Sequence, residues 1–262
     1  MNKTNKFFAI LTGFVIIASA SFVSANHSWA GYHWARSANP LTLALGDNVS
    51  GAWDNTLALA SSDWSISTIL NTSIVAGGTN STRGKNTPKN CVPTLGKVEV
   101  CNAKYGSNGW LGIASIWING EHIIQGTVKM NDTYFNTAKY NTAAWRNMVL
   151  CQEVGHTFGL DHQDENFNNS PLGTCMDYTN DPTPNQHPNT HDYEELALIY
   201  SHLDSSALLA ESTKGSSNIQ IDNEDMRTWG KLVRESSDKR LAVYERDLGH
   251  ANKIHTFVFW AE

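Results

Sequence analysis

A short segment in the middle of the chain has residue types and a spacing suited to metal-assisted hydrolysis. Gln152 and His156 lie four positions apart, so on a helix both side chains would point from one face toward a single point. Glu153 lies one step further round the same helix. In metal hydrolases such a pair holds zinc, while the adjacent glutamate takes a proton from the zinc-bound water. The segment therefore predicts a zinc-dependent hydrolase.

Gly159 supplies the change of direction that a third ligand needs. A glycine at this position would end the helix and let the chain turn back, so that His162 can reach the same metal. The whole segment, Gln152-Glu153-Val154-Gly155-His156-Thr157-Phe158-Gly159-Leu160-Asp161-His162, resembles the metzincin family of metalloproteases. That family has the motif HExxHxxGxxH, followed downstream by a turn that contains methionine.

The resemblance implies a role for each matching residue. His156 and His162 would bind one catalytic zinc ion, and Glu153 would be the general base and acid. Met176 would lie in the turn beneath the metal. Tyr178 matches the tyrosine that astacins and serralysins place near the zinc, where it could donate a hydrogen bond to the oxyanion.

Gln152 departs from the family motif, because it stands where the first zinc-binding histidine is expected. An amide oxygen is a weaker metal ligand than imidazole. Three interpretations remain open. Gln152 binds the metal through its oxygen and the protein is a secreted zinc endopeptidase, which the presence of Glu153 favours. Alternatively His122, His187 or His191 replaces it, or the protein is catalytically inactive and binds peptides or proteins without cleaving them.

The elements expected around this segment follow the family's order from about Pro40 to Leu203. Apolar periodicity and turn residues predict an α+β, metzincin-like (zincin) domain with a twisted mixed sheet, an active-site helix that begins near Thr142, and a C-terminal helix. Strands are expected at 40–45, 69–75, 98–100, 111–118 and 123–130, and helices at 51–64, 142–159 and 191–203.

One of these strands would bind the substrate. By the resemblance, the segment with Gly112, Ile113 and Ala114 is the antiparallel edge strand above the cleft. An extended chain can add to such an edge through main-chain hydrogen bonds. The expected partners are therefore exposed or unfolded polypeptides.

The two ends of the chain suggest export and a small appendage. Lys3 and Lys6 precede an apolar run that ends at Val23-Ser24-Ala25, which predicts a signal peptide over residues 1–25. The metzincin-like domain is expected over 26–204, and a linker with a small β-rich extension over 205–262. No second apolar stretch approaches membrane length. We expect a secreted monomer without a membrane anchor.

Charge and cysteine content agree with an exported protein. The signal peptide would remove two of 19 basic residues and none of 25 acidic ones, which leaves 17 against 25 and a net charge of −8. Nucleic acid is therefore not an expected partner. Four cysteines predict two disulfides, with three pairings to choose from. Cys91–Cys101 would close a short loop. The resemblance favours Cys151–Cys175, because these residues directly precede the motif and Met176.

Other polar residues give weaker signals. His27 and His33, with tryptophans nearby, are expected to pack rather than take part in chemistry. Calcium is the other cation that the chain could bind, but the acidic residues near the motif lack a recognisable loop spacing and are expected to be solvated. These residues are Asp161, Asp164, Glu165 and Asp181.

Overall fold

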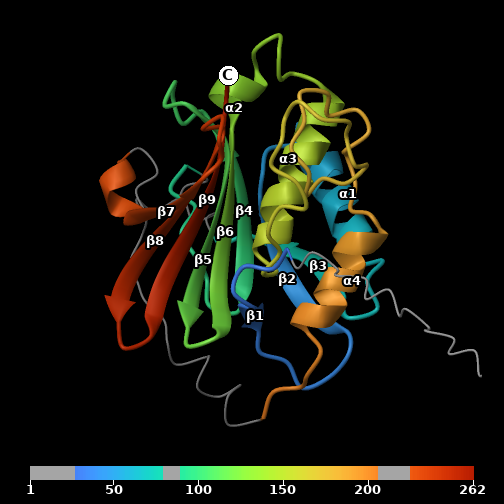
Figure 1. Cartoon of the computed structure of the whole chain (residues 1–262), viewed down its shortest axis with the longest axis vertical. Coiled ribbons are helices and arrows are strands. Elements are labelled where there is room, and N and C mark those ends of the chain that lie inside the picture. The colour runs from blue at the N-terminus through green and yellow to red at the C-terminus, as the bar shows by residue number, and fades with distance from the viewer. Residues whose placement is uncertain (1–26, 79–88, 206–224) are drawn as a thin grey trace, which may run out of the picture.

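The computed structural model describes residues 27–78, 89–205 and 225–262. The predicted signal peptide and most of the predicted linker lie outside these residues. The described strands form one mixed sheet in the order β3-β2-β4-β6-β5-β9-β8-β7, and β1 also pairs with β6. Helices α1, α3 and α4 lie on one side of the sheet (Figure 1). The prediction of an α+β fold with a mixed sheet is confirmed.

The strands are β1 (His33–Trp34), β2 (Leu41–Asn48), β3 (Leu70–Ala76), β4 (Lys97–Ala103), β5 (Trp110–Asn119), β6 (His122–Asn131), β7 (Lys231–Glu235), β8 (Leu241–Gly249) and β9 (Asn252–Trp260). The helices are α1 (Asp54–Trp64), α2 (Asp132–Phe135), α3 (Ala143–His156), α4 (Thr190–Ile199) and the 3-10 turn η1 (Met226–Thr228). Neighbours among β3, β2, β4 and β6 are parallel, and neighbours from β6 to β7 are antiparallel.

The C-terminal extension is β-rich, as predicted, but its strands continue the main sheet. β9 pairs with β5 along nearly its whole length, and β8 and β7 follow outward (Figure 1). The predicted edge strand is therefore an internal strand. Apolar residues on β9 can complete the core between sheet and helices, which is the physical reason for this placement.

Helix α3 carries the motif, as the sequence predicts. Thr142 caps its start, and the Thr142 hydroxyl oxygen accepts a hydrogen bond from the Trp145 backbone N–H at 3.2 Å. The chain reverses at Gly159, whose φ is +95°. A Cβ there would lie 2.0 Å from the carbonyl oxygen of Tyr32, so only glycine fits this turn.

Helix α4 ends at Ile199, four residues before the predicted end at Leu203. The Arg36 guanidinium donates to the carbonyl oxygen of Tyr200. The backbone N–H of Asp204 then donates to the carbonyl oxygen of Arg36 at 2.7 Å. These contacts stop the helix and lead the chain back toward β1. The β5–β6 turn consists of Gly120 and Glu121.

Both predicted disulfides are present. Cys91 bonds to Cys101 and Cys151 bonds to Cys175. Two disulfides fit an extracellular protein. Within the described ranges, every helix is too short or too polar to cross a bilayer.

Candidate functional site

The structure brings the motif side chains together under the sheet. Gln152, Glu153 and His156 are buried on the face of α3 that packs inward, and the turn at Gly159 returns His162 to them. The rings of His156 and His162 lie 4.4 Å apart between centroids and are nearly perpendicular. The predicted convergence of these two histidines is confirmed.

The surroundings of His156 fix one of its ring nitrogens. Nδ1 of His156 lies 2.9 Å from the carbonyl oxygen of Leu160, which can only accept, so Nδ1 carries the hydrogen. Nδ1 of His162 lies 3.3 Å from a carboxylate oxygen of Asp161, and neither ring nitrogen of His162 has a hydrogen-bond partner. Burial lowers the pKa of both imidazoles, so both are neutral at pH 7. The neutral His156 ring, held at Nδ1, presents a lone pair at Nε2, which is how metal-binding histidines are oriented.

Several buried polar atoms of this cluster lack a hydrogen-bond partner. The Gln152 amide nitrogen donates to the carbonyl oxygen of Cys175 at 3.0 Å, which leaves its Oε1 unpartnered. Nε2 of His162 and Oε2 of Glu153 are also unpartnered. Each such atom costs roughly 1–3 kcal/mol when buried. Oxygen and nitrogen acceptors without donors fit a bound cation.

Glu153 packs tightly against β5. A Cβ on Gly112 would lie 2.6 Å from Oε1 of Glu153 and 2.7 Å from Cγ1 of Val149. Burial raises the pKa of Glu153 well above its usual value, and a backbone hydrogen bond from Ala114 opposes that shift. Gly112 and Ala114, predicted to bind substrate, therefore lie against the predicted general base.

Met176 and Tyr178 also lie at the cluster. A Cβ on Gly155 would lie 2.7 Å from Sδ of Met176, so the methionine packs directly against the backbone of α3. The Tyr178 ring lies 4.5 Å from the ring of His162. Burial raises the pKa of Tyr178, which keeps its hydroxyl protonated. The disulfide from Cys151 to Cys175 joins the helix to the segment that carries both residues.

The C-terminal strands cover this cluster. The ring of Phe257 stacks on His156 at 4.5 Å between centroids, with only 7° between the planes. The ring of Phe259 lies 4.9 Å from that of Tyr178. The sequence indicates a strand in this region, but nothing local in it shows which strand it pairs with. Both phenylalanines are therefore site residues that sequence reasoning missed.

The prediction of an open substrate edge at Gly112, Ile113 and Ala114 was wrong. These residues pair, in order, with Phe259, Val258 and Phe257 of β9. β5 already has a neighbour on each side, because β6 occupies the other. A second chain cannot add to β5 while β9 is in place.

The sequence predicts that the acidic residues near the motif are solvated, but the structure shows that not all of them are. Arg234 of β7 forms ion pairs with Asp161 and Glu165. Burial alone would raise the pKa of Asp161, but contacts with His162 and Arg234 outweigh it and lower the pKa to about 2. Asp181 remains exposed. Since Arg234 already neutralises two of these carboxylates, calcium is not favoured here.

The histidines considered as replacements for Gln152 have other partners. Nε2 of His122 lies 3.1 Å from Asp204, and Nδ1 of His187 lies 2.7 Å from Asp63. Nδ1 of His191 lies 2.8 Å from Nε2 of His27. All three imidazoles therefore contact other side chains and not Gln152.

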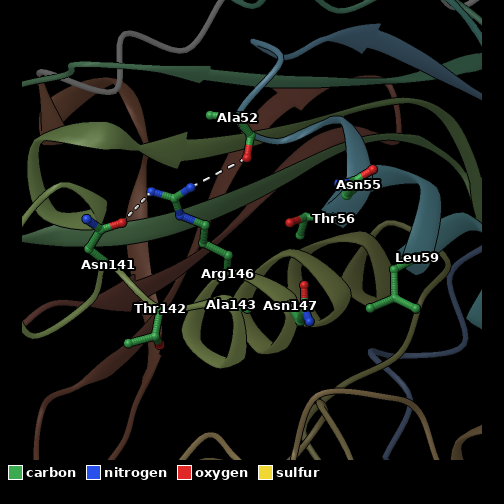
Figure 2. Close-up of a pocket in the computed structure, with 9 residues that line it drawn as sticks. All are labelled: Ala52, Asn55, Thr56, Leu59, Asn141, Thr142, Ala143, Arg146 and Asn147. Atoms are coloured by element: carbon green, nitrogen blue, oxygen red, sulfur yellow. Dashed lines mark hydrogen bonds between the residues drawn. The ribbon is translucent and has the colours of Figure 1, made fainter.

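A surface hollow of about 450 Å³ lies elsewhere, between the first turns of α1 and α3 (Figure 2). Arg146 crosses it and donates to Oδ1 of Asn141 at 2.9 Å and to the carbonyl oxygen of Ala52 at 3.5 Å. The hollow contains no motif residue.

No protein-family model matches the chain, and no curated protein matches it. The functional interpretation therefore depends on the geometry described above.

Proposed function

We propose that the chain is a secreted, metal-dependent endopeptidase whose cleft is closed by its own C-terminal strands. The observation that carries the proposal is the set of buried acceptor atoms without partners at Gln152, Glu153 and His162. The metzincin-like spacing of the motif, with Met176 and Tyr178 beside it, supports the same function.

Each side chain has a role in this reaction. A zinc ion held by His156, His162 and Oε1 of Gln152 would polarise a peptide carbonyl and activate water. Glu153 would accept a proton from the attacking water and pass it to the leaving amine, and its raised pKa suits both transfers. The Tyr178 hydroxyl, kept protonated by burial, would donate to the developing negative charge.

Access to the cluster depends on β9. An extended substrate would pair with β5 where Phe257, Val258 and Phe259 now pair. We therefore expect the described form to cleave proteins slowly, and cleavage to need β9 displaced. The runner-up function is a metzincin-like protein that binds polypeptides without cleaving them. The complete burial of Glu153 against β5 is the observation that favours it.

The experiment compares cleavage of an unfolded protein by the wild type and by Phe257→Ala, each assayed with and without Glu153→Gln. We expect Phe257→Ala to cleave faster than wild type, because it uncovers His156. Adding Glu153→Gln should lower cleavage at least about 100-fold. Bound zinc is measured in all four proteins.

Ile254→Ala is the matched control, because Ile254 lies on the same strand but packs in the cluster on the other face of the sheet. It should not raise cleavage. The proposal fails if Phe257→Ala binds no zinc at the motif and cleaves nothing. Activity that appears only with Gln152→His would favour the runner-up.

A further inference from the structure

A second group of histidines surrounds a carboxylate outside the motif. It comprises His33, His122, His202 and Asp204, and we call it the four-residue cluster. The Nε2 atoms of His33, His122 and His202 lie 3.8, 3.1 and 3.6 Å from Oδ1 of Asp204. Three imidazole nitrogens therefore converge on one oxygen.

Strand pairing brings the first two histidines together. β1 is parallel to β6, and His33 pairs with His122 in that register. Their rings lie 4.9 Å apart between centroids. The chain after α4 then folds back and places the His202 ring 4.8 Å from that of His33. The cluster thus joins three segments that are distant in sequence.

The Asp204 carboxylate is held so that one oxygen faces the imidazoles. Its Oδ2 accepts a hydrogen bond from the backbone N–H of Arg36 at 2.8 Å. The backbone N–H of Asp204 donates to the carbonyl oxygen of Arg36 at 2.7 Å. These two bonds fix Asp204 against the residues that follow β1 and leave Oδ1 for the cluster.

His33 gives an independent sign that a cation belongs here. Its Nδ1 lies 2.8 Å from the carbonyl oxygen of Gly31, so Nδ1 carries the hydrogen and Nε2 carries a lone pair. The side chain is only 4% exposed, and Nε2 has no hydrogen-bond partner. A buried lone pair that faces a carboxylate oxygen is unfavourable. A positive ion between the two atoms removes that cost.

The separations fit ligands around one metal ion. Metal–nitrogen bonds of about 2.0–2.1 Å at tetrahedral angles place neighbouring ligands roughly 3.3 Å apart. The ligand atoms of His33, His202 and Asp204 all lie within 4.8 Å of one another, and His122 is not part of that group. A set of two imidazoles and one carboxylate suits Zn²⁺ and related divalent transition metals better than Ca²⁺ or Mg²⁺.

We propose that His33, His202 and Asp204 of the four-residue cluster form a second metal site, which takes Zn²⁺ and is separate from the motif. His202 is 55% exposed, so an ion can enter from solvent through that side. His122 would hold Asp204 in place, because its Nε2 lies 3.1 Å from Oδ1 of that residue. The ion would tie β1 to the chain after α4.

The test is a zinc titration of tag-free, chelator-stripped protein against a chromophoric competitor. The variants are His202→Ala and His33→Ala, and His250→Asn is the control. His250 is exposed in the β8–β9 turn, with a φ of +52° that asparagine tolerates. His202→Ala and His33→Ala should each lose one zinc equivalent, or bind it at least about 100-fold more weakly, whereas His250→Asn should bind as wild type.

The number of zinc ions bound distinguishes the second site from the proposed catalytic site. If the motif also binds zinc, His202→Ala lowers the count from two to one; if it does not, the count falls from one to zero. In wild type, Co²⁺ should give the visible spectrum of a tetrahedral ion, and His202→Ala should lose that contribution. Unchanged zinc count and affinity in both histidine variants would overturn the proposal.

Discussion

The chain contains two groups of histidines and carboxylates that differ in how they are built. In the motif cluster, Gln152, Glu153 and His156 come from consecutive turns of one helix, and a disulfide and β9 enclose them. In the four-residue cluster, the residues come from three segments and His202 is largely exposed. The first cluster is set by local spacing and then closed by tertiary structure. The second exists only because tertiary structure brings His33 and His202 together.

The largest effect is expected when the Phe257 ring that covers the motif cluster is removed. Phe257→Ala deletes a buried ring that stacks on His156, and we expect the free energy of unfolding to fall by about 3–5 kcal/mol. Urea unfolding measures this change. The zinc affinity of the four-residue cluster should stay unchanged, because Phe257 is not part of it. A loss below about 1 kcal/mol would show that β9 does not pack on the motif.

The disulfides offer the next test. Replacing Cys151 and Cys175 by alanine should cost about 3.5 kcal/mol, from the entropy of a loop that spans 24 positions. Replacing Cys91 and Cys101 should cost about 2.8 kcal/mol, because that loop spans 10. Thermal unfolding gives both values. Only the replacement of Cys151 and Cys175 should weaken zinc binding at the motif. Equal effects of both replacements on zinc affinity would contradict the proposed zinc site at the motif.

Helix α4 connects the two clusters, and its first turn gives a pH-dependent prediction. Asp192 accepts a hydrogen bond from the Thr174 hydroxyl, two residues before Met176. Burial raises the pKa of Asp192 from 3.8 to about 6. Between pH 4 and pH 6 the unfolded chain releases a proton that the folded protein retains, so stability falls as pH rises.

Asp192→Asn should remove that loss of stability. Relative to wild type, the variant should gain up to about 3 kcal/mol in free energy of unfolding between pH 4 and pH 7. Denaturant unfolding at several pH values measures the difference. A difference that does not change with pH would show that Asp192 ionises normally in the folded protein.

The smallest effect is expected where β5 touches Glu153. Gly112→Ala places a Cβ within 2.6 Å of Glu153, and we expect a loss of about 1–3 kcal/mol together with lower cleavage in the Phe257→Ala background. Gly126→Ala on β6 is the control, since its Cβ would meet neighbours only at 3.4 Å or more. Similar losses of stability in both variants would show that β5 is not packed more tightly at Glu153 than β6 is at Gly126.

Patterns that depend on near neighbours were predictable. The helix from Thr142, the stop at Gly159 and the closeness of His156 to His162 follow from the 3.6-residue period and from glycine's tolerance of positive φ. The predicted strands were also found, with shifts of a few residues at their ends. In contrast, α4 ends early because Arg36, far away in sequence, binds the carbonyl oxygen of Tyr200.

The sequence by itself determined the motif cluster, because its ligands depend on separations of four and six residues along one segment. Only the tertiary structure decided that β9 lies beside β5 and that His33 meets His122 and His202. Strand partners are selected by burial of apolar surface over the whole sheet, and no local pattern encodes which edge a distant strand will cover. For the same reason His33, expected from sequence to pack, lies in a cluster of metal-binding residue types.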